Sequence, residues 1–141
     1  MSDSKSEIRK LLPKDSPPAR GAYSHGVLVP LPGADMLFVT GQVAVDPQGN
    51  VVAANDTKKQ AEFVFENIGK ILDEAGLSFR DVVKAQVFLT DINDFSKVSE
   101  VRNKYFAESK PASTMVEVSK LVREGCCVEI EVMAVRLRAM P

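Results

Sequence analysis

Two acidic residues near the C-terminal end of the chain have the types and spacing that could do chemistry. Glu129 and Glu131 lie in the run "CCVEIEVMAVRLR", whose alternation predicts a long strand. Residues two apart on a strand point to the same face, about 6.5–7 Å from each other. Two such carboxylates can divide into an acid and a base when their surroundings separate their pKa values. The alternative is an ion pair with Lys84 or Arg136, which we favour for Glu131.

A second stretch of interest is "KPASTMVEV", from Lys110 to Val118. Pro111 ends a helical pattern, and the residues after it alternate as a strand. We expect one apolar face, made of Thr114, Val116 and Val118. The opposite face is then mixed, with Ser113, Met115 and Glu117. Met115 is expected to fill space, whereas Ser113 raises the question of what this mixed face lines.

Cys126 and Cys127 are the only cysteines, and they are adjacent. On a strand they point to opposite faces, and a metal site would need further ligands. We expect two reduced thiols in the core or at an interface, with no disulfide and no metal.

The composition is that of a soluble globular protein. The 141 residues fit a single domain, which we expect over residues 8–141 after a disordered tail of residues 1–7. A net charge of −1 argues against nucleic acid as a partner. No apolar run approaches the ~20 residues of a membrane span, and the polar N-terminus has no signal-peptide pattern. We therefore expect a cytoplasmic protein with no membrane partner.

The elements that must position these residues follow from periodicity and turn signals. Strands are predicted over residues 7–12, 25–30, 35–44, 81–92, 112–118 and 126–138, with a hairpin turn at "PLPGA". Helices are predicted over residues 57–75 and 94–109. For the first helix we expect a capping box of Thr57 and Gln60, and a left-handed Gly76 after its end. The second helix has Asn93 or Asp94 as its cap.

Two amphipathic helices can cover only one face of one sheet. In the strand over residues 81–92, Val83, Ala85, Val87 and Leu89 are expected on the covered face. The second face is then half polar and half apolar, with Gln86, Phe88, Ser113, Met115, Glu117, Glu129, Glu131, Met133 and Val135. Such a face suggests burial between subunits, with polar groups in clefts, so we expect a homo-oligomer.

Five segments together resemble one known family. They are "GAYSHGV", "FVTGQVAVDPQG", "NIGKILDEAGLSFRDVVKAQVFLTDINDFSKVSEVRNKYF", "KPASTMVEV" and "VEIEVMAV". Their order and spacing, from about Pro17 onward, are similar to those of the Rid/YjgF (RidA-like) family of enamine and imine deaminases. The combination of "TDINDF", "VEV" and "VEIEVMAV" is specific, whereas each motif alone is weak.

The resemblance implies an α+β fold of the chorismate-mutase-like type, a mixed sheet with two helices on one face. It implies a homotrimer with a central barrel and with small-molecule clefts between subunits. The archetype of the family hydrolyses reactive enamines or imines to 2-oxo acids and ammonia, without a cofactor.

The site residues implied by the resemblance are carried over by motif. Tyr23 corresponds to the tyrosine of the family's "PYS" turn, and Gly41 to the glycine that offers backbone contacts near the ligand. Asn93 corresponds to the asparagine of "NDF", and Glu129 to the glutamate thought to position or activate water. The family's carboxylate-binding arginine, in "PARS", corresponds to Ser113, followed by Thr114.

A serine in place of that arginine removes a bidentate charged contact with a substrate carboxylate. Three interpretations remain open: a substrate without a carboxylate, a cation supplied from elsewhere, or loss of catalysis. Arg20 and His25 bear on the second, because both are departures from the family pattern beside Tyr23. His25 is the only histidine, and its ordinary pKa of about 6.5 suits proton transfer. The alternative, which we favour, is a solvated Arg20 and a surface or interface hydrogen bond of His25.

Three functions compete at this stage. The first is hydrolytic deamination of a small reactive enamine or imine, with a carbonyl compound and ammonia as products. The second is a non-catalytic trimer that binds a small metabolite or serves as a scaffold. The third, a ribonuclease or translation inhibitor, is disfavoured by the acidic pI of about 5.9 and the single histidine.

Overall fold

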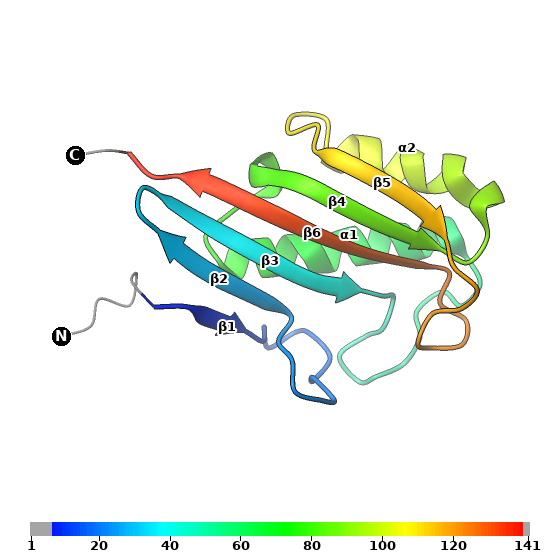
Figure 1. Ribbon diagram of the computed structural model, residues 1–141. Helices are drawn as coiled ribbons and strands as arrows, with labels where there is room; N and C mark the ends of the chain where they lie inside the picture. Colours follow the sequence, from blue (N-terminus) through cyan, green and yellow to red (C-terminus); the bar gives the residue numbers. More distant parts are fainter. Residues whose placement is uncertain (1–6, 140–141) are drawn as a thin grey trace.

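The computed structural model describes residues 7–139 and contains one six-stranded sheet (Figure 1). In spatial order the strands are β1 (Arg9–Leu11), β2 (Gly26–Leu31), β3 (Ala34–Gln42), β6 (Val128–Leu137), β4 (Val82–Leu89) and β5 (Ala112–Glu117). Every strand expected from the sequence is present. Of the expected tail, only Glu7 lies within the described residues.

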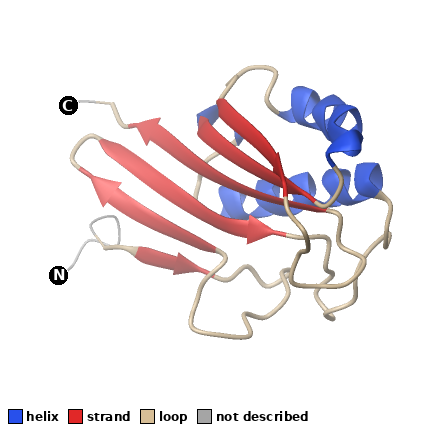
Figure 2. Cartoon of the chain, turned by 45° about the vertical axis from the view of Figure 1, so that its right-hand side comes forward, coloured by secondary structure: helices blue, strands red, loops and turns tan. Residues whose placement is uncertain are grey.

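The sheet is mixed. All neighbouring pairs are antiparallel except β4 and β5, which run parallel. Parallel neighbours need a crossover, and the 3₁₀ turn η3 (Ile92–Asp94) with helix α2 (Phe95–Tyr105) supplies it. Both helices, α1 (Thr57–Glu74) and α2, lie on one face of the sheet, as Figure 2 shows. The prediction of an α+β fold with two helices on one face is confirmed.

The core fills the space between this face and the helices. Its largest fully buried side chains come from both layers: Phe65, Ile68, Ile71 and Leu72 of α1, and Leu37, Leu89 and Ile130 of the sheet. Burying a side chain of this size contributes roughly 1.5–3 kcal/mol, so this layer stabilises the fold and holds the strands in register. No helix within residues 7–139 combines the length and apolar character needed to cross a bilayer.

The ends of α1 match the sequence prediction only in part. Gly76 has φ +77° and follows the helix, as expected. The cap is not Thr57, however, because the Asp56 side chain accepts the hydrogen bond from the Lys59 amide. Thr57 instead donates its hydroxyl to Asp94, which links the first turns of the two helices. Gln60 faces inward and binds loop backbone rather than its own helix.

Two predicted strand faces are wrong. In β4, a register shift between Val82 and Lys84 turns Val82 into the core and leaves Val83 exposed. In β5, the parallel register places Ser113 beside Ala85 and Met115 beside Val87, both of which point toward the helices. The expected apolar face of β5, with Thr114 and Val116, therefore lies on the open face of the sheet, and Ser113, Met115 and Glu117 lie on the helix side.

Candidate functional site

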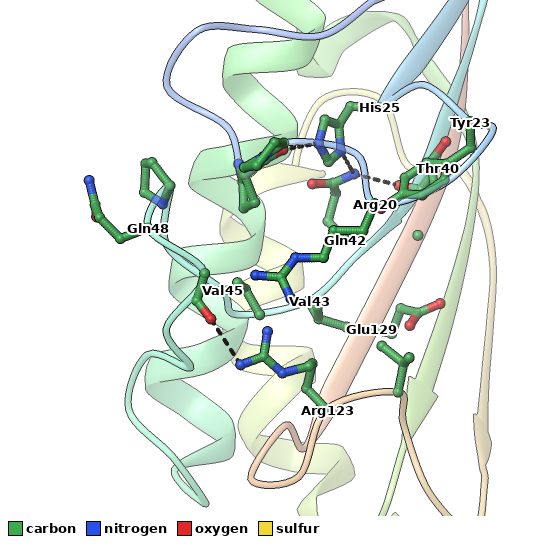
Figure 3. A pocket seen from close by; sticks show the side chains of 16 residues that line it. Arg20, Tyr23, His25, Thr40, Gln42, Val43, Val45, Gln48, Arg123 and Glu129 are labelled. Carbon is green, nitrogen blue, oxygen red and sulfur yellow. Dashed lines mark hydrogen bonds between the residues drawn. The ribbon is translucent and has the colours of Figure 1, made fainter.

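A cavity of about 500 Å³ opens beyond the end of β3. Its walls come from the loop before β2, the end of β3 with the loop after it, the loop before β6, and β6 itself (Figure 3). Small-molecule sites typically have volumes of about 300–1,000 Å³, and this cavity lies within that range. The residues with polar or charged side chains in its wall are Arg20, Tyr23, His25, Thr40, Gln42, Gln48, Arg123 and Glu129.

Glu129 and Gly41 are in direct contact across the β3–β6 pair. A Cβ atom on Gly41 would lie 2.9 Å from Glu129 Cδ and closer still to one carboxylate oxygen. A register shift between Val39 and Gln42 bends β3 at this point. The carboxylate of Glu129 therefore occupies space that exists only because residue 41 has no side chain.

Burial raises the pKa of the Glu129 carboxyl above its ordinary value, and the negative charge of Glu131 raises it further. No arginine or lysine is within ion-pairing distance of Glu129 among residues 7–139. A carboxylate with a raised pKa accepts a proton more readily at neutral pH than an exposed one. Glu129 therefore has the position and the electrostatics of a general base.

His25 is buried, and both of its ring nitrogens are used within the chain. Nε2 lies 2.6 Å from the Pro17 carbonyl oxygen, which can only accept, so the proton is on Nε2. Nδ1 then accepts from the Gln42 side chain at 3.4 Å, and Gln42 also donates to the Thr40 carbonyl. These bonds tie the loop before β2 to the end of β3.

Tyr23 packs edge-on against the His25 ring, with centroids 6.1 Å apart, and is half exposed at the cavity. The favoured alternative expected a hydrogen bond of His25 at the surface or at an interface, but His25 is buried and its hydrogen bonds lie within its own chain. His25 thus holds Tyr23 and the loop in place.

Gln60 holds the other side of the site together, although it lies beneath the cavity wall. Its buried amide donates to the carbonyl oxygens of Val52, Ala53 and Gly125, and it accepts from the Cys127 amide at 2.7 Å. This one side chain fixes the loop after β3 to the start of β6, two residues before Glu129.

Two arginines reach the cavity from different loops. The Arg123 Nη2 atom donates to the Gly49 carbonyl oxygen at 2.9 Å. Arg20 lies against the same residue, because a Cβ atom on Gly49 would be 3.0 Å from Arg20 Nη2. Gly49 has φ +88°, in a tight turn that Asp46 stabilises by accepting from the Gln48 and Asn50 amides.

The structure brings five of the expected site residues to this cavity: Arg20, Tyr23, His25, Gly41 and Glu129. The other three lie elsewhere in the chain. Ser113 lines a separate hollow between β5 and α2, with Arg102 and Lys110. Thr114 is exposed on the open face. Asn93 is exposed in η3, where its backbone N–H donates to the Asp91 carboxylate. Within the single chain, therefore, the expected site residues divide into two groups.

Sequence reasoning missed Arg123, Gln42 and Gln60. Arg123 lies in an irregular loop that carries no motif, so only the folded chain places it beside Arg20. Gln60 was assigned to a helix cap, and the fact that it lies at a core position of the helical stripe was the available signal of burial. Among the described residues, no group of three or more His, Cys, Asp or Glu side chains is placed to hold a metal ion.

Comparison with known proteins places the chain in a family. Residues 13–136 match the family model described as Endoribonuclease L-PSP, and the chain belongs to this family, the Rid/YjgF family that its motifs indicate. A RutC family protein of Pyrococcus abyssi is 44% identical over 84% of this chain and 90% of its own length.

Two further relatives carry more informative names. A protein of Bos taurus named 2-iminobutanoate/2-iminopropanoate deaminase is 39% identical, over 92% of this chain and 91% of its own. A solved structure from Yersinia pestis, described as a member of the conserved Rid protein family, superposes with a TM-score of 0.81 at 36% identity. The match covers 91% of this chain and 98% of the Yersinia pestis chain.

Proposed function

We propose that the protein is a hydrolytic deaminase of small reactive imines and enamines, and that Glu129 is its general base. The single observation that carries the proposal is the position of Glu129, a carboxylate of raised pKa facing a cavity of about 500 Å³. The name of the Bos taurus relative, an imine deaminase, supports the same reaction class.

The chemistry needs only water and one proton carrier. An enamine first becomes its imine by protonation at carbon. Glu129 takes a proton from water as the oxygen bonds to the C=N carbon, and the nitrogen takes a proton from solvent to give a carbinolamine. Glu129 then returns its proton to the nitrogen. As the C–N bond breaks, the hydroxyl oxygen forms the C=O bond and releases its proton to solvent, and ammonia and a carbonyl compound leave. Tyr23 and the backbone at Gly41 position the substrate.

The proposal includes a homotrimer whose clefts complete the site. The open face of the sheet exposes apolar side chains in one subunit: Phe38 and Val116 are exposed, and Met36, Met133 and Val135 are half-buried. Covering such a face is favourable, at roughly 25 cal/mol per Å² of apolar surface. A neighbouring copy would also supply the second group of expected residues, Asn93, Ser113 and Thr114.

The test is ammonia release from imines generated in solution by an amino-acid oxidase. Wild type is compared with Glu129→Ala and with Glu62→Ala, which removes an exposed carboxylate of α1. We expect release above the spontaneous rate in wild type and in Glu62→Ala, and a loss of about 10²–10⁴-fold in Glu129→Ala.

Absence of release above the spontaneous rate in wild type would overturn the proposal. A rise of melting temperature with added imine or 2-oxo acid would then favour the non-catalytic binding trimer. Cleavage of a small RNA by wild type but not by Glu129→Ala would favour the nuclease alternative.

A further inference from the structure

His25 and Gln42 are two buried polar side chains in the wall of the cavity that holds Glu129. His25 is 7% exposed and Gln42 is 4% exposed. The side-chain nitrogen of Gln42 lies between two partners, the Thr40 carbonyl oxygen at 2.9 Å and His25 Nδ1 at 3.4 Å, as Figure 3 shows. A buried polar group without a partner is costly, so the fold depends on which of these atoms donate and which accept.

Two backbone carbonyl oxygens determine the direction of these hydrogen bonds. The Pro17 oxygen can only accept, so His25 Nε2, 2.6 Å away, has a proton. The Thr40 oxygen can also only accept, so the amide nitrogen of Gln42, and not its oxygen, faces both Thr40 and His25. His25 Nδ1 must then be the acceptor. The geometry therefore requires a neutral imidazole whose single proton is on Nε2.

A second proton on His25 is incompatible with this arrangement. It would place an N–H on Nδ1 that faces the NH₂ group of Gln42, and two donors repel each other. If the Gln42 amide turned over to present its oxygen to Nδ1, that oxygen would also face the Thr40 carbonyl oxygen, and two acceptors repel each other. In both cases the Thr40 carbonyl oxygen loses its donor.

The Thr40 carbonyl group and the Gly41 N–H belong to one planar peptide unit. A hydrogen bond that holds the carbonyl oxygen therefore also sets the direction of the Gly41 amide. Gly41 lies against the Glu129 carboxylate, and the proposed function uses its backbone to position the substrate. Thr40 is also bound to the loop before β2, because its amide donates to the His25 carbonyl oxygen and its hydroxyl to that of Ser24. This loop and the end of β3 therefore form one connected unit.

The surroundings of His25 offer no carboxylate that would hold a second proton in place. The charged or titratable side chains that line the cavity with it come from its own loop, the loop before β6 and β6: Arg20, Tyr23, Arg123 and Glu129. Of these, Tyr23 packs edge-on against the imidazole. β1 and β3 contact His25 through uncharged groups, the Leu11 carbonyl oxygen and the Gln42 amide. Among residues 7–139, no Asp or Glu side chain is hydrogen-bonded to the ring.

We propose that neutral His25, acting through Gln42, is a positioning residue that holds the Thr40–Gly41 peptide against Glu129, and that a second proton on its ring releases this peptide. Histidine is the side chain that usually changes charge near neutral pH. The site then contains two proton-dependent groups, because Glu129 must be ionised and His25 must be neutral. The effect on the reaction rests on the proposed function, whereas the release of the peptide can be observed without turnover.

The first experiment observes the release directly by NMR, since the chain has a single histidine. Long-range ¹H–¹⁵N spectra show which ring nitrogen of His25 has a proton, and the Gly41 amide signal reports on the peptide. Both are followed as pH is lowered in Glu129→Gln, so that titration of Glu129 does not move the Gly41 signal. We expect the Nε2–H form at about pH 7.5 and a Gly41 signal that shifts with the same midpoint as the ring. Adding His25→Gln should abolish this shift.

The second experiment measures kcat for imine hydrolysis at decreasing pH, over the range in which circular dichroism shows the fold to be intact. Two groups that must both lose a proton make kcat fall by about 100-fold per pH unit at the acid end, and one group by about 10-fold. We expect the steeper fall in wild type and the shallower one in His25→Gln, because a glutamine has a donor and an acceptor but gains no proton.

Two further variants separate positioning from folding. His25→Ala leaves Gln42 without its acceptor and should lower kcat by about 10-fold or more at about pH 7.5, whereas His25→Gln should retain most of it. Glu62→Gln also removes one titratable side chain, but on the exposed side of α1, and should keep the wild-type pH profile.

An Nδ1–H form at about pH 7.5 would overturn the proposal, as would a Gly41 signal that does not follow the titration of His25. An acid limb of equal steepness in wild type and His25→Gln would do the same. If wild type shows no turnover, the NMR titration still decides whether His25 controls the Thr40–Gly41 peptide. Failure of the proposed function and failure of this inference are therefore distinguishable.

Discussion

Gly41 lies against Glu129 so closely that no side chain could stand between them: a Cβ atom at position 41 would be 2.9 Å from Glu129 Cδ and 3.1 Å from Cγ. The absence of a side chain at position 41 therefore determines where the carboxylate of Glu129 points. The resemblance implies backbone contacts of this glycine to a ligand, and the structure shows in addition that it leaves room for the Glu129 carboxylate.

Gly41→Ala should displace the Glu129 carboxylate and lower kcat by about 10-fold or more, since small misplacements of a catalytic group are costly. The measurement is kcat for imine hydrolysis with the melting temperature as a fold check. In a Glu129→Gln background the same substitution should have little further effect on kcat, because both changes act on one group. If the two substitutions instead lower kcat by independent factors that multiply, Gly41 does not act through Glu129.

The raised pKa of Glu129 predicts how activity depends on pH. The base must be ionised, so kcat should rise with pH through a pKa above the ordinary glutamate value of 4.5. Burial is the first cause of the shift and Glu131 the second, so Glu131→Gln should move this acid limb modestly toward lower pH. Measuring kcat from pH 4 to 8 for wild type and for Glu131→Gln checks this. If the acid limb of the profile lies at the same pH in both, Glu131 does not contribute to the raised pKa.

The same pKa predicts how stability depends on pH. A carboxyl whose folded-state pKa is raised binds its proton more tightly when folded than when unfolded. Its contribution to stability is complete below about pH 4.5 and is lost as pH rises through the folded-state value. Relative to Glu129→Gln, wild type should therefore lose free energy of unfolding as pH rises above 4.5, as measured by urea denaturation at each pH.

The sequence predicted the fold correctly where the hydrophobic periodicity was clear. The stripe of α1 and the alternation of β6 predicted the helix layer and the face of Glu129. The faces of β5 were assigned wrongly because an edge strand is exposed on both sides, so the more apolar residues, Val116 and Thr114, did not mark the core. Val83 was misplaced because a bulge shifts the alternation by one residue without changing the composition.

The residues that line the cavity were predicted where motifs carried them and missed where only the folded chain brings them together. Tyr23, Gly41 and Glu129 stand in recognisable segments and meet in one cavity. Arg123 reaches that cavity through a loop, and its partner at Gly49 is distant in sequence. Pairing of this kind depends on the path of two loops, which local sequence preference does not determine.

Gln60 should be among the most sensitive positions for stability, although it is polar. It is fully buried and makes four hydrogen bonds to backbone groups. Gln60→Leu keeps most of the volume but leaves those groups without partners, so we expect a loss of about 3 kcal/mol in the free energy of unfolding. Gln48→Leu, at an exposed position, is the control, and similar losses for both would contradict the bridging role of Gln60.

The open face of the sheet gives the last prediction, on oligomeric state. Phe38 stands on β3 opposite Met133 of β6, and it is 41% exposed in the single chain. If copies of the chain pack through this face, Phe38→Glu would bury a charge without a partner, and the trimer should dissociate at micromolar concentration. Lys70→Glu, on the exposed side of α1, changes a charge on the opposite layer and should leave the mass of the assembly unchanged.

Sedimentation equilibrium of wild type, Phe38→Glu and Lys70→Glu measures this mass. Ammonia release should fall as the trimer dissociates, because Asn93 and Ser113 would no longer reach a neighbour's cavity. A wild type that sediments as a monomer, or a trimeric Phe38→Glu, would place the second group of site residues outside the reaction.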